Sequence, residues 1–377
     1  MPSSLNDRHA RTPHLDALRI VAAAAVVVLH YAEYTKDNAA AGFVFAHVQH
    51  FNLFVDLFFV ISGFVIAKQY LAKVDTGSDM KRFFWRRVAR IYPLHLLTLG
   101  FYLVIAMALQ LGLARGDNPA RYPLSDIPAQ LLMLHALIGE RLTFNFPSWS
   151  LSAEMFCYLA FPLLAACVAR RKLSILLIVI LAIAVNTAAS LLLPDAGPWT
   201  SWINHGGAFR ALPSFALGVG LFVFCEKLDA APTLRLPFTA VLVVFLVFGG
   251  SLPQALMLAT VYLVVLLAAR ADATGQVTLL SRSRLDRLSD LTYALYMLHI
   301  PVATVVLTIG SRILAPHMTD AKLALVPLAI GVLTVASVLS FRYIETPIRH
   351  YLYALYDRRT EARPGLRTAA AGGGDGR

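Results

Sequence analysis

The chain has 377 residues, of which 58% are apolar and only 15% are charged. Because so few charged residues cannot cover the surfaces of two or three soluble domains, this composition excludes a soluble multidomain protein, and it also excludes a disordered chain. The net charge of +11 indicates Lys and Arg kept in the cytoplasmic loops of a membrane protein, so we expect no nucleic acid partner. We therefore predict an all-α integral membrane protein.

A helix needs about 20 apolar residues to cross a bilayer, and runs of that kind predict about ten transmembrane helices. A further apolar run over Ile127–Ile138 is too short to cross and is predicted to be interfacial or re-entrant. With the N-terminus inside, both termini are then cytoplasmic, and most Lys and Arg residues lie on the cytoplasmic side, as the positive-inside rule requires. The predicted spans are Leu15–Ala32, Phe51–Leu71, Tyr92–Leu113, Trp149–Val168, Leu173–Leu193, Ala208–Cys225, Leu236–Gly250, Pro253–Ala269, Leu291–Gly310 and Leu323–Ile344.

This topology divides the chain into three parts. Residues 1–13 form a cytoplasmic tail, residues 14–357 form the transmembrane domain, and residues 358–377, which are rich in Ala, Gly and Arg, are expected to form a disordered cytoplasmic tail.

The first predicted span carries Asp16, Arg19 and His30. Ionisable residues inside a bilayer are costly, so each is a functional candidate. On a helix, Arg19 and His30 lie about 20° apart around the axis and about 16 Å apart along it. One face therefore holds a cation near the cytoplasmic end and an imidazole near the outer end. In the alternative interpretation, Arg19 extends to the inner headgroups and His30 sits at the outer interface.

Two acidic residues reach a depth similar to that of His30. Asp56 lies in the aromatic run of the second span, where it either ties two helices together or orients and charge-balances His30. Glu154 lies near the outer end of the fourth span, and a lone intramembrane Glu favours a functional role. The start of that span holds a candidate interface anchor and two candidate helix caps: Trp149, Ser150 and Ser152.

Lys81–Pro93 reads KRFFWRRVARIYP, which predicts an amphipathic helix on the cytoplasmic face. Its basic side either attracts anionic lipid or grips the phosphates of a cytosolic ligand. The arginines on that side are Arg82, Arg86, Arg87 and Arg90.

Two later motifs have mainly structural interpretations. In LTYALYMLHIPV, Pro301 is expected to kink the helix and His299 to satisfy backbone groups that the kink frees. In RYIETPIR, Glu345 lies at the cytoplasmic end of the last span, where an ion pair with nearby arginines is expected.

Taken together, these segments resemble the membrane-bound acyltransferase-3 family. The resemblance rests on LDALRIVAAAAVVVLHY, VDLFFVISGFVIA, FFWRRVARIYPLH, PSWSLSAEMFCYLAFP, LTYALYMLHIPV and RYIETPIR, in family order over residues 14–352. One departure is Met155, where the family often has a second acid after the Glu. A paired carboxylate is therefore not expected here.

The resemblance implies that the chain is a bacterial inner-membrane enzyme that transfers an acyl group, most often acetyl, from cytosolic acyl-CoA to a hydroxyl. Implied acceptors are lipopolysaccharide O-antigen, exopolysaccharide or another cell-envelope carbohydrate, or a small molecule such as a macrolide. Under this hypothesis, Arg86, Arg87 and Arg90 hold the nucleotide phosphates and Arg19 contacts the pyrophosphate or the pantetheine arm.

His30 is then the general base on the hydroxyl or a transient acyl carrier, and Glu154 or Asp56 sets its tautomer and stabilises its charged form. Acyl-CoA is expected as a co-substrate, with no bound cofactor or metal. Intramembrane His, Glu and Arg are also what a proton-coupled transporter needs, so that function is the main alternative. A lipid-binding scaffold is a third, which explains the Arg-rich helix but not the buried His30 and Glu154.

Overall fold

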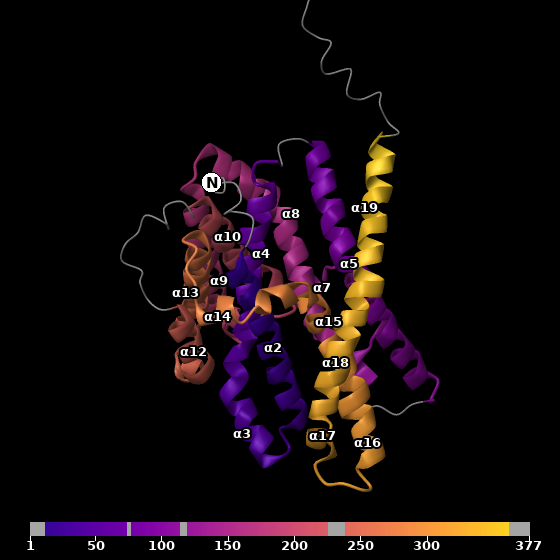
Figure 1. Cartoon of the computed structure of the whole chain (residues 1–377). Coiled ribbons are helices and arrows are strands. Elements are labelled where there is room, and N and C mark those ends of the chain that lie inside the picture. The colour runs from indigo at the N-terminus through magenta and orange to yellow at the C-terminus, as the bar shows by residue number, and fades with distance from the viewer. Residues whose placement is uncertain (1–11, 74–76, 114–118, 225–237, 362–377) are drawn as a thin grey trace, which may run out of the picture.

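The structure is a computed structural model that describes residues 12–73, 77–113, 119–224 and 238–361 (Figure 1). Within those residues every regular element is helical. Eight helical segments are long and apolar enough to cross a membrane. This confirms the predicted class, an all-α integral membrane protein. The eight segments are Pro13–Thr35, Ala39–Tyr70, Gly77–Gln110, Phe146–Arg170, Ser174–Leu192, Gln254–Ala273, Leu285–Leu314 and Val326–Thr360.

Two of the ten predicted spans coincide with shorter apolar helices, Gly207–Val223 and Phe238–Ser251. Both fall short of the length of about 20 residues that usually crosses a bilayer, so the total of ten stays a prediction. The run over Ile127–Ile138 forms two short helices, α6 (Ile127–Leu131) and α7 (His135–Ile138). Met133 between them has a φ of 55°, which breaks the helix. As predicted, this run is too short to span.

The Arg-rich segment is not a separate helix. It forms the first half of α5 (Gly77–Gln110), a single helix of 34 residues, which is about 51 Å long. Figure 1 shows α5 alongside α19 (Thr346–Glu361). Because α19 continues to Glu361, residues 358–361 are helical, unlike the disordered tail that we expected from residue 358. The remaining residues of that tail, 362–377, and residues 1–11 lie outside the described part of the chain.

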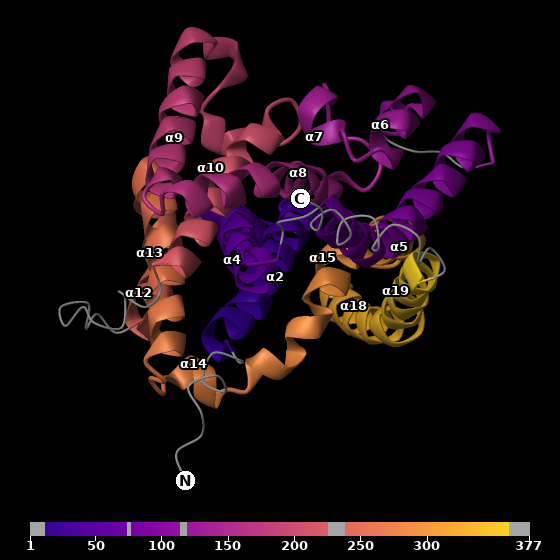
Figure 2. The ribbon, with the colours of Figure 1, turned by 90° about the horizontal axis from the view of Figure 1, so that it is seen from above.

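Two helices occupy the centre of the bundle, α2 (Pro13–Thr35) and α4 (Phe54–Tyr70) (Figure 2). On one side lie α9 (Ser174–Leu192), α10 (Gly207–Val223), α12 (Phe238–Phe248) and α13 (Gln254–Ala273). On the other side lie α5, α15 (Thr292–Val302), α18 (Val326–Ser340) and α19.

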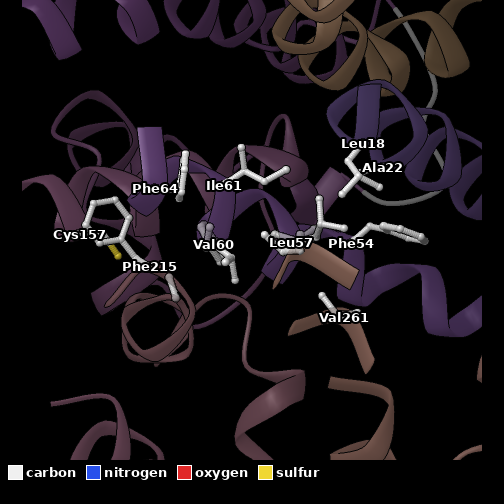
Figure 3. Close-up of a cluster of buried hydrophobic side chains, with 14 of the residues drawn as sticks. Leu18, Ala22, Phe54, Leu57, Val60, Ile61, Phe64, Cys157, Phe215 and Val261 are labelled. Carbon is white, nitrogen blue, oxygen red and sulfur yellow. The ribbon is translucent and has the colours of Figure 1, made fainter. Parts of the chain in front are cut away.

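The contact between α4 and α10 depends on glycine. A Cβ added at Gly63 or Gly218 would overlap backbone atoms of Phe215 or Val60, respectively. Small residues of this kind let two helix backbones approach closely inside a membrane. Figure 3 shows the apolar cluster that extends from this contact along α4, with Phe64 of α4 and Phe215 of α10 at one end and Phe54 of α4 and Leu18 of α2 at the other.

Both ends of α2 are fastened to other helices. At its start, the Asp272 carboxylate of α13 accepts hydrogen bonds from the backbone N–H groups of His14 and Leu15, at 2.9 and 3.1 Å. The His14 ring contacts the same carboxylate at 2.7 Å. At its other end, the Tyr31 hydroxyl donates to the His299 carbonyl of α15, at 3.2 Å. These contacts fix the helix that carries Arg19 and His30.

Candidate active site

A cavity of about 510 Å³ lies between α2, α4, α5, α15, α19 and α8 (Trp149–Arg170), at the end of the bundle where α2 begins. The part of the cavity deeper in the bundle is lined by Val55, Phe58, Ser150 and Tyr296, and the part nearer the start of α2 is strongly charged. The charged residues that line it are Asp16, Arg19, Lys68, Arg87, Arg90, Glu154, Asp290, Glu345 and Arg349.

Three of the four predicted acyl-CoA-binding arginines meet in this cavity. Arg19 lies 3.8 Å from the Asp16 carboxylate, and Arg90 of α5 lines the same cavity. The Arg87 guanidinium is buried between aromatic rings, 5.2 Å from the centre of Tyr70 and 5.8 Å from the centre of Tyr158. The rings and a hydrogen bond to the Tyr70 hydroxyl at 3.2 Å hold the planar guanidinium of Arg87 in place.

The fourth arginine, Arg86, does not line this cavity. Its guanidinium stacks on Tyr353 of α19, 5.3 Å from the ring centre, and Arg82 on the same face pairs with Asp357 at 3.1 Å. Arg86 instead lines a smaller cavity of about 350 Å³, together with Lys73. The arginines of α5 thus face two directions. Arg82 and Arg86 face α19, whereas Arg87 and Arg90 face the larger cavity.

Glu154 lines the larger cavity with two hydroxyl donors. Ser62 of α4 donates to its Oε1 at 2.5 Å, and Tyr158, one turn further along α8, donates to the same oxygen at 2.6 Å. Within the described residues no contact joins Glu154 to His30. Glu154 therefore does not set the His30 tautomer in this structure, contrary to one part of the sequence hypothesis.

Asp56 also has a different partner from the one proposed. Its carboxylate accepts from Nη2 and Nε of Arg210 at 2.6 and 3.2 Å, and both side chains are 1% exposed. Ser214 of α10 adds a contact at 3.4 Å. Asp56 is thus a tie between α4 and α10, one of the two roles that the sequence allowed.

The three polar and aromatic residues at the start of α8 have roles that differ from those expected. Trp149 is only 6% exposed and lies over Arg210, at 5.3 Å, so it is not an interface anchor. The Ser150 hydroxyl contacts the Tyr296 hydroxyl at 2.8 Å. The Ser152 hydroxyl donates to the Met133 carbonyl at 2.6 Å. Neither serine caps the helix, because both hydroxyls join α8 to other segments.

His30 lies outside the larger cavity, in a cluster of its own. Its ring stacks on His299 with centres 5.2 Å apart and meets Phe146 edge-on at 5.1 Å. Nδ1 lies 3.6 Å from the Glu33 carboxylate, and the His30 side chain is 18% exposed. His299 in turn contacts Tyr296, which lines the cavity. Tyr296 and His299 therefore lie between the cavity and His30.

Pro301 frees the carbonyl of Met297, four residues earlier. The side-chain amide of Asn145 donates to that carbonyl at 3.0 Å. His299 instead contacts the Tyr296 carbonyl through Nδ1, at 2.6 Å. His299 thus satisfies a backbone group, but not the one that the proline frees.

Glu345 is buried in the π-helical turn Phe341–Glu345. Ser340 donates to its carboxylate at 3.0 Å. Among the described residues no arginine forms an ion pair with it, although Arg90 and Arg349 line the same cavity. The expected ion pair was therefore wrong, and Glu345 adds an acid to the cavity wall.

Sequence reasoning missed several partners of the site residues. Glu33 follows His30 by three residues and Tyr158 follows Glu154 by four, which are the spacings that place two side chains on one face of a helix. Those spacings were available signals. Ser62 and Arg210 come from distant helices, so only the packing identifies their partners.

The family model described as "Acyltransferase domain" matches residues 13–342 of this chain. Over 163 residues the chain is 36% identical to "Acyltransferase MdmB" of Streptomyces mycarofaciens; this alignment covers 41% of this chain and 40% of that protein. Over 86 residues it is 38% identical to "Protein 2 in picA locus" of Rhizobium radiobacter; this alignment covers 22% of this chain and 40% of that protein. The matched part thus spans about two fifths of each relative's length. No solved structure matches the chain.

Proposed function

The chain belongs to the acyltransferase-3 family, and from this premise we propose that it moves an acyl group, in the first instance acetyl, from acyl-CoA to a hydroxyl of a carbohydrate. We place it in the bacterial inner membrane, with the larger cavity open to the cytosol. The observation that carries the proposal is the cavity with Arg19, Arg87 and Arg90 at its charged end and Tyr296, next to the His30 cluster, at its inner end.

The donor fits the charged end by its chemistry. Coenzyme A carries a pyrophosphate and a third phosphate, and guanidinium groups form strong, charge-assisted hydrogen bonds with phosphate oxygens. A volume of about 510 Å³ lies within the range of small-molecule sites. The smaller cavity shares Gln69 with the larger one. It offers Lys73 and Arg86 for the part of the nucleotide that extends beyond the main cavity.

Glu154 has a place on the donor side of this scheme. Its carboxylate is held by Ser62 and Tyr158, and its remaining oxygen is an acceptor for an amide N–H. The pantetheine arm of coenzyme A has two amides. We assign Glu154 the role of positioning that arm, so that the thioester points toward Tyr296 and His30.

His30 supplies the chemistry of transfer. As general base it takes the proton of the acceptor hydroxyl while the oxygen attacks the thioester carbonyl. The new C–O bond forms, the C–S bond breaks, and the proton passes from His30 to the departing thiolate. In the covalent variant, a ring nitrogen of His30 attacks the thioester carbonyl, the C–S bond breaks and the thiolate leaves. The acceptor oxygen then attacks the acyl group on His30, the N–C bond breaks, and the hydroxyl proton passes to the thiolate. In both, the Glu33 carboxylate facing Nδ1 stabilises the charged ring, which is the role first proposed for Glu154 or Asp56.

The test compares membranes that contain wild-type protein, His30→Gln or the control His47→Gln at equal expression. His47 is an exposed residue of α3 (Ala39–Val48). Each is incubated with acetyl-CoA labelled in the acetyl group and with a crude envelope glycan fraction. We expect CoA release and labelled glycan from wild type and the control, and a loss of more than a hundredfold in His30→Gln. Transfer that survives in folded His30→Gln would refute the role of His30.

If wild type releases no CoA with any glycan fraction, transfer from acetyl-CoA to a glycan is refuted, and another acyl donor or acceptor or the transporter alternative is left. The transporter alternative then predicts proton-coupled flux in sealed vesicles.

A further inference from the structure

Four buried polar atoms without a hydrogen-bond partner gather around one phenylalanine. They are Nδ1 of His30, which faces the Glu33 carboxylate at 3.6 Å, just beyond hydrogen-bond distance, Nη2 of Arg121, Oδ1 of Asn145 and Nε2 of His299. These residues come from parts of the chain that are far apart in sequence. Buried polar groups without partners are rare in folded proteins, and a group of them in one place points to a ligand or to water.

Phe146 connects the four residues. His30 meets its ring at 5.1 Å, and the Arg121 guanidinium lies over the ring, also at 5.1 Å. His299 stacks on His30, and Asn145 precedes Phe146 in the chain. The backbone N–H of Phe144 also donates to the Arg121 carbonyl at 3.1 Å. This contact holds the Arg121 segment against the cluster.

The surroundings fix whether each unpartnered atom is a hydrogen-bond donor or an acceptor. Because a carbonyl only accepts, the Tyr296 carbonyl requires a proton on Nδ1 of His299, which leaves Nε2 as an acceptor. The Met297 carbonyl likewise requires the NH₂ group of Asn145, which leaves Oδ1 as an acceptor. Arg121 offers only donors. The cluster thus presents two acceptors and one donor.

A set of neighbouring hydroxyls complements this arrangement, because each hydroxyl both donates and accepts. The Glu33 side chain is 47% exposed and that of His30 is 18% exposed. His30 and Glu33 are therefore exposed at a part of the surface that does not belong to the larger cavity.

We propose that Arg121, Asn145 and His299 form the binding site of the acyl acceptor, a sugar or similar polyol held by hydroxyls adjacent to the one that reacts at His30. This inference rests on the proposed function. Asn145 and His299 accept hydrogen bonds from the neighbouring hydroxyls, and Arg121 donates to a ring or hydroxyl oxygen. All three are positioning residues, and none takes part in bond making.

The test separates acceptor binding from donor binding. Steady-state KM values for the glycan fraction and for acetyl-CoA are measured on wild type, Arg121→Gln, His299→Asn and the control Arg141→Gln, an exposed arginine of the same connecting segment. His299→Asn keeps a donor for the Tyr296 carbonyl but removes the Nε2 acceptor. The thermal midpoint of each purified variant confirms that it is folded.

We expect the KM for glycan to rise about tenfold in Arg121→Gln and in His299→Asn, as the loss of one hydrogen bond predicts. The KM for acetyl-CoA should change less than twofold. Unchanged glycan KM values in both folded variants, or an equal rise in the KM for acetyl-CoA, would overturn the proposal. The first outcome would mean that water alone satisfies the four atoms.

A binding measurement keeps this test independent of catalysis. Labelled envelope oligosaccharides are dialysed to equilibrium against purified wild type and Arg121→Gln. Binding that weakens about tenfold in Arg121→Gln supports the site, even where no CoA is released and the proposed function has failed. Equal binding by wild type and Arg121→Gln, or no binding by either, refutes the site.

Discussion

The buried pair of Asp56 and Arg210 should behave as a structural tie, and this can be measured. Each side chain is 1% exposed, and the carboxylate receives two guanidinium hydrogen bonds, at 2.6 and 3.2 Å. Removing one partner leaves a charge buried without compensation, which costs about 3–5 kcal/mol. We therefore expect Arg210→Met to lower the free energy of unfolding by about that amount.

The double variant Asp56→Leu, Arg210→Met isolates the pair. Replacing both members of a buried ion pair with apolar residues of similar size is often neutral or stabilising. We thus expect the double variant to recover most of the stability that Arg210→Met loses. The assay is the thermal midpoint in detergent for wild type, both single variants and the double variant, together with acyl transfer per folded molecule.

Activity decides between the two roles that the sequence allows for Asp56. If Asp56 only joins α4 to α10, the double variant should transfer acyl groups within about threefold of wild type, because it stays folded and His30 is untouched. A double variant that keeps the wild-type midpoint but loses transfer more than a hundredfold would show that Asp56 acts on the reaction. That result would refute our assignment.

Three further predictions concern packing, acid stability and donor binding. Gly63→Ala and Gly218→Ala should each lower the thermal midpoint, because the new Cβ overlaps the facing backbone, whereas Ala substitution at an open glycine should not. Burial lowers the pKa of His135 to about 4 from its usual 6.5. Between pH 6.5 and pH 4 the ring is therefore protonated in the unfolded chain but not in the folded one. The free energy of unfolding is unaffected above pH 6.5 and falls by about 3 kcal/mol as the pH drops from 6.5 to 4. Denaturation midpoints against pH should show this loss, and His135→Gln should reduce it. Arg87→Gln should raise the KM for acetyl-CoA at least tenfold, and more than Arg86→Gln does, because only Arg87 lines the larger cavity; equal effects would contradict that placement.

The sequence was sufficient to predict the fold class and the approximate positions of the long helices. Because a run of about 20 apolar residues is typical of a helix that crosses a bilayer, each of the eight long segments was located. Three boundaries were missed by a dozen residues or more, where the helices continue beyond their apolar runs: the starts of Ala39–Tyr70 and Gly77–Gln110 and the end of Val326–Thr360. The join between the Arg-rich segment and the following span was missed, because amphipathic and apolar stretches suggest two environments. The backbone of α5 is nevertheless continuous, and Pro93 lies inside it without ending it.

The site was predicted residue by residue but not as an arrangement. Arg19 and Glu154 were identified because charge inside a bilayer is costly, and Arg87 and Arg90 because they lie on the basic side of an amphipathic helix. All four line one cavity. Their partners depend on helix rotation and on which helices are neighbours. Helix rotation and the choice of neighbouring helices are determined by packing contacts, such as those of the glycines between α4 and α10, and a single sequence does not show which residues pack together. We therefore expected Asp56 to interact with His30, because the two residues lie at a similar depth in the membrane. In the packed bundle, Asp56 pairs with Arg210 instead.

Tyr296 lies between the larger cavity and the His30 cluster. Its hydroxyl contacts Ser150 at 2.8 Å, and its carbonyl accepts a hydrogen bond from His299 at 2.6 Å. Under the proposed function, the acyl group passes this side chain to reach His30. We expect Tyr296→Phe to retain transfer, since the ring and the carbonyl remain, and Tyr296→Ala to widen the passage. Tyr296→Ala should then use butyryl-CoA better relative to acetyl-CoA than wild type does, measured as a ratio of kcat/KM. A ratio unchanged from wild type in folded Tyr296→Ala would place the acyl route elsewhere.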